Sequence, residues 1–402
     1  MYDLAAMGAW LEFGVRWLHV ITAIAWIGSS FYFIALDLGL YRDRKLPSGA
    51  DGEEWQVHGG GFYHIQKYLV APENMPDGLI WHKWQSYWTW ISGFVLLVLV
   101  YYLGAEFYLI DANVMDLATW QAVGLSLASL AFGWVAYTVL CNVFVNANQT
   151  VLMVALFVVL VAMAWFYTHV FTGRAALLHL GAFTATLMSG NVFFVIIPNQ
   201  KIVVADLIAG RTPDAKYGKI AKQRSTHNNY LTLPVIFLML SNHYPLAFAS
   251  EWNWVIASLV FLMGVTIRHW FNTHHARKGN PHWTWAVTLL IFIAIVWLSV
   301  APAAQREAVV ITRFAEAKGF TDVHDIVLGR CSMCHAAEPV WSGLLWAPMG
   351  VALETEADLT RHARAVYLQA GISHAMPPAN LSYMQEDERA AIVAWYRAAI
   401  GG

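Results

Sequence analysis

Residues 150–171 read TVLMVALFVVLVAMAWFYTHVF, an apolar run without any Asp, Glu, Lys or Arg. A bilayer core of roughly 30 Å needs about 20 mostly apolar residues per helix, so this run predicts a membrane-spanning helix. Seven further stretches meet or approach that length. The eight expected spans lie near residues 13–38, 86–104, 118–140, 150–171, 177–197, 230–247, 252–272 and 283–301. We therefore expect an all-α fold whose main part is an eight-helix transmembrane bundle.

The composition agrees with this interpretation. Of the 402 residues, 58% are apolar and 12% are charged, and the mean hydropathy is +0.48. A soluble domain has about 45–50% apolar and about 25% charged residues. The net charge of −2 excludes the basic surface of a nucleic-acid-binding protein. Three cysteines are too few for a disulfide framework.

Basic residues between the expected spans indicate the orientation. The segments after the first, fifth and seventh spans carry Arg42, Arg44, Lys45, Lys67, Lys83, Lys201, Arg211, Lys216, Lys219, Lys222, Arg224, Arg277 and Lys278. The segments after the second and sixth spans carry none, and the one after the fourth has only Arg174. Since cytoplasmic loops are enriched in Lys and Arg, we expect both termini on the outer side of the membrane. The first span lacks the basic n-region of a signal peptide and is expected to remain.

The chain is expected to have three parts. Residues 1–302 form the bundle, residues 303–319 a linker or helix, and residues 320–402 a small soluble domain, because charged residues become frequent after residue 302. The 41–85 segment is long for a loop. It is predicted either to cover the cytoplasmic mouth as a lid or to be merely structural.

The motif Cys331-Ser-Met-Cys334-His335 predicts a covalently attached c-type haem, with His335 as an iron ligand. The sixth ligand is expected to be Met376, next to two prolines; the alternatives are Met349, Met384 and His374. A zinc knuckle is the other interpretation of the motif, but no second Cys/His pair with zinc spacing follows. Residues 386–399 predict a terminal amphipathic helix. Residues 320–402 as a whole resemble a class I cytochrome c.

Four histidines fall in the outer half of the expected bundle: His19, His169, His179 and His243. Imidazoles on facing helices can hold haem iron, so one or two haem b groups are a hypothesis for the bundle. The distance between an electron donor at the cytoplasmic side and the covalent haem would be roughly 30 Å. A haem inside the bundle would divide this distance into two shorter electron-transfer steps. The alternative is that these histidines hydrogen-bond neighbouring helices. Cys141 is expected to be a plain interior residue.

A second polar cluster is expected near the cytoplasmic helix ends. Arg224, His227, Asn228 and Asn229 precede the sixth span, and Arg268 closes the seventh. Guanidinium groups pair with anions and amides read donor and acceptor edges, so the cluster suits a planar, anionic heterocycle. Helix-cap residues and snorkelling arginines would explain the same pattern without a ligand.

The chain resembles the membrane-bound, cytochrome c-fused urate oxidases (urate hydroxylases) of bacteria over nearly its whole length. The matching segments are WLHV (17–20), WIGSS (26–30), NVFF (191–194), PNQK (198–201), STHNNY (225–230), SNHYP (241–245) and CSMCH (331–335), together with Met376. The resemblance implies an oxidoreductase of the bacterial inner membrane, with its cytochrome domain in the periplasm. It implies oxidation of urate to 5-hydroxyisourate, with electrons passing through the fused cytochrome to a soluble cytochrome c or terminal oxidase rather than forming hydrogen peroxide.

A mechanism can be stated as a hypothesis on this basis. Arg224 or Arg268 would pair with the urate anion, Asn228 and Asn229 would bind its carbonyl and imide edges, and His227 would take a proton. One rival function is a quinol-linked or other respiratory membrane cytochrome, which the lack of cysteines or clustered carboxylates beside these histidines disfavours. Another is a transporter or assembly protein with the cytochrome as a redox sensor.

Overall fold

The computed structural model describes residues 4–401 apart from residues 71, 73–75, 77, 113, 145–147, 301–311 and 345. The chain divides into two compact units, residues 1–301 and 302–402, which are described separately. Most of the predicted linker at 303–319 falls in 301–311, outside the described residues.

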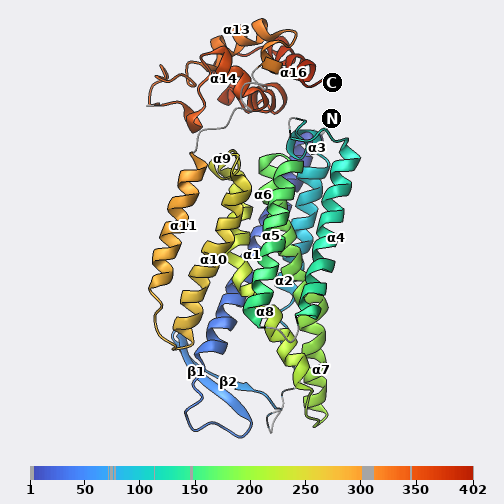
Figure 1. Cartoon of the computed structure of the whole chain (residues 1–402), viewed down its shortest axis with the longest axis vertical. Coiled ribbons are helices and arrows are strands. Elements are labelled where there is room, and N and C mark those ends of the chain that lie inside the picture. The colour runs from blue at the N-terminus through green and yellow to red at the C-terminus, as the bar shows by residue number, and fades with distance from the viewer. Residues whose placement is uncertain are drawn as a thin grey trace. The chain divides into compact units, whose positions relative to one another are not determined.

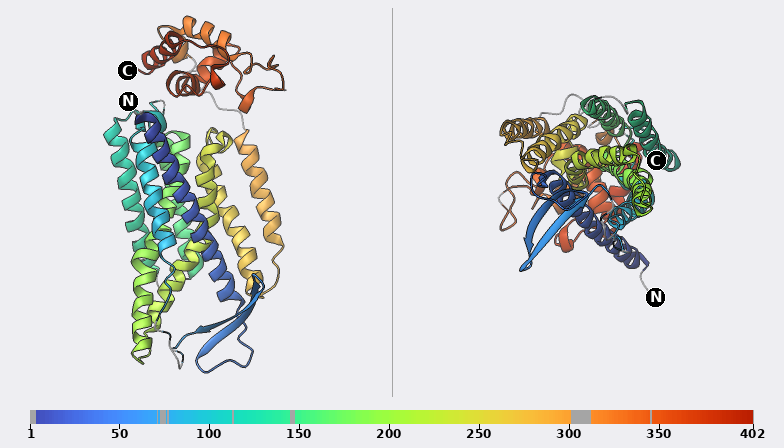
Figure 2. Two further views of the ribbon diagram at one scale, coloured as in Figure 1. Left: turned by 180° about the vertical axis from the view of Figure 1, so that it is seen from behind. Right: turned by 90° about the horizontal axis from the view of Figure 1, so that it is seen from below.

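The first unit is mostly helical, and its long helices lie side by side (Figures 1 and 2). Its elements are α1 (Leu4–Gly39), β1 (Ala50–His58), β2 (Gly61–Tyr68), α2 (Trp84–Leu96), η1 (Leu97–Tyr102), α3 (Ala105–Tyr108), α4 (Thr119–Val143), α5 (Gln149–Val170), α6 (Gly173–Gly190), η2 (Asn191–Ile196), α7 (Ile197–Ile208), α8 (Ala215–Leu240), η3 (Ser241–His243), α9 (Pro245–Phe248), α10 (Asn253–His275) and α11 (Trp283–Ser299). η1 and η2 are π-helical, and η3 is a 3₁₀ turn.

Several of these helices suit a membrane. Five helical stretches in the described part are long and apolar enough to cross one: Met7–Gly39, Thr119–Val143, Gln149–Val170, Gly173–Ile208 and Asn253–His275. Trp283–Ser299 is apolar but shorter. The remaining predicted spans, 86–104 and 230–247, correspond to α2 with η1 and to the second half of α8. The number of spans, eight, stays a prediction.

Helix α8 begins fifteen residues before the predicted start at residue 230. Asp214 caps it, since its Oδ1 accepts a hydrogen bond from the backbone N–H of Lys216 at 2.9 Å. The residues that follow, 215–230, are largely polar, so hydropathy marked only the apolar second half of this helix. The polar residues 224–229 therefore lie inside a long helix rather than at its entry.

The all-α prediction is wrong in the 41–85 segment, where β1 and β2 form an antiparallel hairpin. Gly59 and Gly60 make its two-residue turn with φ of +59° and +81°. A tight hairpin turn with two positive φ angles favours glycine at both positions. The hairpin is tied to the helices through Asp37 of α1, which forms ion pairs with Lys67 of β2 and Lys222 of α8.

The core of the first unit is formed mainly by α4, α5 and α6 with parts of α8 and α10. Cys141 of α4 is buried there, as predicted. Helices α8 and α10 come close where Gly264 faces Pro234. A Cβ at Gly264 would lie 2.6 Å from Cδ of the proline, so only glycine fits this crossing without displacement.

Helices α6 and α7 form one continuous helix from Gly173 to Ile208, interrupted only by the π-helical stretch η2. A π turn is wider than an α turn because its hydrogen bonds span five residues, and such turns are frequent at functional sites. Asn191, the first residue of η2, is fully buried.

The second unit contains α13 (Phe320–Cys331), η4 (Pro348–Gly350), α14 (Glu356–Arg361), α15 (Ala363–Val366), η5 (Tyr367–Ile372), η6 (Pro378–Asn380) and α16 (Glu386–Ile400). Helix α16 confirms the predicted terminal helix. Its Trp395 is 1% exposed and donates a hydrogen bond from Nε1 to the carbonyl of Phe314 at 3.0 Å. Val323 and Val327 of α13 and Ile392 of α16 are also buried in this unit.

Candidate functional site

Five buried polar side chains form a connected group inside the first unit. Arg224, His227 and Asn228 come from α8, Asn191 from η2 and Tyr137 from α4, and each is at most 5% exposed. Asn191 Nδ2 donates to the Tyr137 hydroxyl and to Asn228 Oδ1, both at 2.9 Å. Nη1 of Arg224 donates to Asn191 Oδ1 at 3.4 Å, and the Tyr137 hydroxyl lies 2.7 Å from His227 Nδ1. We call these residues the Arg224 group.

The directions of these hydrogen bonds are fixed by the chemistry of the donors. Arg224 can only donate, so the Asn191 atom facing it is the oxygen. Asn228 donates to a backbone carbonyl of α6 at 3.0 Å, so its oxygen faces Asn191. The Tyr137 oxygen therefore accepts from Asn191, and its hydrogen points to His227 Nδ1. In neutral His227 the ring hydrogen is then on Nε2.

A second group lies between α8 and α10. Arg268 donates from Nε to Asn229 Oδ1 at 3.3 Å and from Nη2 to Asn272 Oδ1 at 3.0 Å. Asn272 Nδ2 also donates to Asn229 Oδ1, at 2.9 Å. The guanidinium carbon of Arg268 lies 4.2 Å from the centre of the Phe31 ring of α1. We call Arg268, Asn229 and Asn272 the Arg268 group.

Both arginines are buried, and neither pairs with a carboxylate in the described part of the chain. A buried charge without a counterion is costly, so a bound anion would stabilise either position. Three buried polar atoms of the two groups have no protein partner: Arg224 Nε, His227 Nε2 and Asn229 Nδ2. All three carry hydrogens that can donate, and the site is therefore suited to an anion with several acceptor atoms.

The predicted site residues thus divide into two groups. Successive residues of an α-helix are turned by about 100°, so Asn229 faces α10 while Arg224 and Asn228 face α6 and η2. No hydrogen bond between described side chains joins the two groups. Sequence analysis missed Tyr137 and Asn191 as site residues because both lie inside expected membrane spans, far in sequence from the polar run at 224–229. A hydrogen-bonding side chain inside an apolar span is itself a signal by which they could have been found.

The four histidines expected to hold haem b are not brought into contact with one another. His179 is fully buried and uses both ring nitrogens, Nδ1 with the carbonyl of Ala175 at 2.7 Å and Nε2 with Ser126 Oγ at 2.9 Å. His19 Nδ1 lies 3.0 Å from a carbonyl of α2. His169 Nδ1 is bonded within α5, and His243 is exposed. His179 as placed has no nitrogen free for iron, and haem b stays a prediction.

The residues of the c-type haem motif lie at the end of α13. The thiols of Cys331 and Cys334 are free, and the backbone N–H of His335 donates to the carbonyl of Cys331 at 2.9 Å. His335 Nδ1 lies 2.8 Å from the carbonyl of Val351, to which it can only donate. This bond leaves Nε2 as the ring nitrogen with a free lone pair, as in metal-binding histidines. The donor set therefore fits a haem iron.

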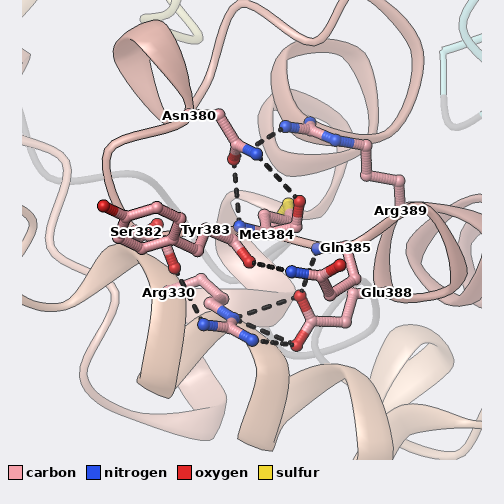
Figure 3. Close-up of polar contacts among 8 residues, drawn as sticks. All are labelled: Arg330, Asn380, Ser382, Tyr383, Met384, Gln385, Glu388 and Arg389. Carbon is pink, nitrogen blue, oxygen red and sulfur yellow. Dashed lines mark hydrogen bonds and ion pairs between the residues drawn. The ribbon is translucent and has the colours of Figure 1, made fainter.

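One arginine, Arg389, holds the chain around the candidate sixth ligand, half-buried Met376. Arg389 of α16 donates from Nη1 to the carbonyls of Ala370 and Met376 and from Nη2 to Asn380 Oδ1. Asn380 in turn exchanges two hydrogen bonds with the backbone of Met384 (Figure 3). Of the alternative ligands, Met384 is 2% exposed and Met349 is 74% exposed, and His374 is also exposed.

The nearby ion pair of Arg330 and Glu388 joins α13 to α16. Arg330 contacts both carboxylate oxygens of Glu388, from Nε at 3.0 and 3.1 Å and from Nη2 at 2.9 Å (Figure 3). Burial alone would raise the pKa of Glu388, but Arg330 and the backbone N–H of Gln385 outweigh it and hold that pKa below its ordinary value. Burial, with the neighbouring Cys334, raises the pKa of the Cys331 thiol to about 11.

The fold and the sites define a mostly helical protein with apolar helices that suit a membrane and a buried interior site that suits a small anion. Residues 5–299 match the profile of the urate oxidase N-terminal family, and the chain belongs to that family. No curated protein and no solved structure gives a match. The family supports the predicted relation to urate oxidases, and it indicates an oxidoreductase with urate as substrate. Residues 300–402 lie outside the match.

Proposed function

We propose that the protein is an integral-membrane urate oxidase that converts urate to 5-hydroxyisourate and passes the electrons to a covalent haem. Cys331 and Cys334 would bind the haem, with His335 and Met376 as iron ligands. A soluble cytochrome c or a terminal oxidase would be the next acceptor. The family match supports the substrate, and the Cys-x-x-Cys-His motif with its bonded His335 supports the haem.

The observation that carries the proposal is the buried guanidinium of Arg224, which has no carboxylate partner among the described residues. Urate is a planar monoanion with carbonyl oxygens, so it would supply the missing negative charge and acceptors for Arg224 Nε and His227 Nε2. Asn191, itself bonded to Asn228, accepts a hydrogen bond from Arg224, and Tyr137 holds His227 in place. The Arg268 group would be a second point of anion contact.

The reaction removes two electrons and two protons from urate and adds water at the ring. With Tyr137 donating to its Nδ1, His227 offers Nε2–H to a urate oxygen and can stabilise charge that develops there. The sequence-based hypothesis made His227 a base. To accept a proton at Nε2, His227 must first adopt the other tautomer, with its ring hydrogen on Nδ1. The Tyr137 hydroxyl would then have to rotate so that its hydrogen no longer points to Nδ1. When bound, the haem supplies one-electron acceptance.

The membrane location rests on the apolar helices, and the orientation on the Lys and Arg distribution. We place the protein in the bacterial inner membrane with both termini and the cytochrome-like unit in the periplasm. Urate would then reach the buried groups from the cytoplasmic side. Electrons would leave on the opposite side of the bilayer, by a route that the four bundle histidines do not define.

An anaerobic urate titration of the oxidised protein tests the proposal. Urate should reduce the haem, visible as the appearance of the ferrous α-band, with two electrons delivered per urate. Arg224→Gln should abolish this reduction, whereas the control Arg211→Gln should not, since Arg211 is exposed and pairs with Asp206. His227→Ala should also abolish it while leaving the covalent haem attached. Reduction by a quinol but not by urate would contradict the proposal.

A further inference from the structure

A large groove runs along the outside of the helices beside His227. Its volume is about 1190 Å³, and it is lined by α5, by α8 as far as Leu231 and by α10. Helix α10 packs against both α5 and α8, and the three are labelled in Figure 1. At one end Gln223 of α8 reaches across to Gln149 of α5, with Nε2 to Oε1 at 3.1 Å. Of the Arg224 group, only His227 lines the groove.

The lining changes from basic to apolar along the groove. Lys216, Lys219 and Lys222 of α8 line one end. The other end is lined by Leu160, Leu231 and Phe261, with Met153, Val154, Leu156, Phe157, Leu262 and Val265 between. From residue 216 to residue 231 the helix rises about 22 Å at 1.5 Å per residue. One leaflet contributes about half of the roughly 30 Å bilayer core. The groove is therefore longer than the hydrocarbon part of one leaflet.

The basic end keeps a positive excess. Lys216 pairs with Asp214 at 3.0 Å, and Lys222 pairs with Asp37 at 3.3 Å. Asp37 is itself shared with a further lysine of the hairpin. Lys219 lines the groove, is exposed, and forms no ion pair with any described residue. Asp214 also lines this end, so three lysines stand beside one lining carboxylate. A phosphate here would meet at least Lys219, which has no ion-pair partner among the described residues, and the amide of Gln149.

We propose that this groove binds one anionic phospholipid, with its phosphate at Lys219 and an acyl chain along the apolar part of α5, α8 and α10. Basic pockets between helices at the cytoplasmic side suit such headgroups, and a mostly apolar lining suits hydrocarbon rather than a free anion. Because His227 borders the groove, the acyl chain would close the side wall of the Arg224 group. The inference rests on the proposed membrane location and not on the urate reaction.

The test is lipid retention by the full chain. The protein is placed in nanodiscs of equal parts phosphatidylglycerol and phosphatidylcholine, and the lipids that stay bound on release are counted by native mass spectrometry. The wild type should retain one phosphatidylglycerol in preference to phosphatidylcholine. Lys219→Ala should weaken this retention about fivefold, the effect of one lysine at a membrane surface. The control Lys201→Ala removes an exposed charge of α7 that does not line the groove, and should change nothing.

A second pair of variants tests the apolar part without changing charge. Val154→Trp fills the groove and should lower retention, whereas Val158→Trp, one turn further on α5 and outside the lining, should not. Equal retention of the two lipids, or equal loss in Lys201→Ala and Lys219→Ala, would overturn the proposal. So would displacement of the lipid by inorganic phosphate alone. None of these measurements uses urate. A negative result would therefore refute the lipid site without affecting the proposed urate reaction, and a failed urate titration would leave the lipid site untouched.

Discussion

Replacing Tyr137 with phenylalanine removes one oxygen from the middle of the Arg224 group. That oxygen accepts from Asn191 at 2.9 Å and donates to His227 Nδ1 at 2.7 Å. The ring of Tyr137 is 1% exposed, so no solvent replaces the hydroxyl. Without it His227 loses both the partner that orients its ring and the bond that keeps its hydrogen on Nε2.

The expected magnitudes follow from what is left unpaired. His227 Nδ1 and one N–H of Asn191 remain buried without a partner, at about 1–3 kcal/mol each, so we expect the free energy of unfolding to fall by about 2–6 kcal/mol. Loss of an orienting partner of a functional histidine costs about 10–100-fold in activity. We expect that loss in kcat. Because Arg224 keeps its bond to Asn191, KM for urate should change by less than about threefold.

Tyr167→Phe is the matched control for this assay, anaerobic reduction of the haem by urate followed in a stopped-flow instrument. Tyr167 of α5 is equally buried, and its hydroxyl lies 2.7 Å from Ser129 Oγ, away from the site. Ser129 keeps a bond to the carbonyl of Ser126 in the variant, so the stability loss should be only about 1 kcal/mol and kcat should be unchanged. A wild-type kcat in Tyr137→Phe would show that the fixed tautomer is irrelevant.

Three further outcomes are expected. Gly264→Ala should destabilise the helical unit by about 1–3 kcal/mol in thermal unfolding through its clash at the α8–α10 crossing, whereas Gly124→Ala, which meets nothing within 4 Å, should not. The pKa of Glu388 is lower in the folded protein than in the unfolded chain. Its ion pair with Arg330 therefore stabilises the fold fully at pH values above the pKa of the unfolded chain. This stabilisation is lost as the pH falls through the pKa of the folded protein. Glu388→Gln should therefore cost about 1–2 kcal/mol at pH 7 and little at pH 3. In haem-free protein at pH 8, iodoacetamide should alkylate Cys334 before the more buried Cys331, because a pKa of about 11 leaves roughly 10⁻³ of the Cys331 thiol ionised.

The apolar helices were predictable because their hydrophobicity is continuous over the required length. The run at 150–171 predicts α5, observed at Gln149–Val170, almost to the residue. Hydropathy failed for the first half of α8, since a polar helix supported by its neighbours looks like a loop. It also missed the hairpin, although Gly59-Gly60 between β-forming segments was a usable signal.

The candidate site was predictable in its residue types but not in its arrangement. The polar run at 224–229 indicated the correct helix, yet six residues in sequence cannot show which neighbours their side chains meet. Asn191 and Tyr137 are essential to the hydrogen-bond directions, and they come from segments far apart in the chain. The c-type haem motif was easier because its residues are local, so spacing alone specifies most of the ligand set.

The widened turn of η2 has a consequence for comparing members of this family. A π turn accommodates one residue beyond regular α spacing. A homologue with one residue fewer between 191 and 196 could close this turn as a regular α-helix, with the two halves of the helix still in register. The side chains inside the turn, including the amide of Asn191, would then be directed differently relative to α8. A one-residue gap at this place in a pairwise alignment would thus identify members whose anion chemistry differs, even when every polar residue is retained.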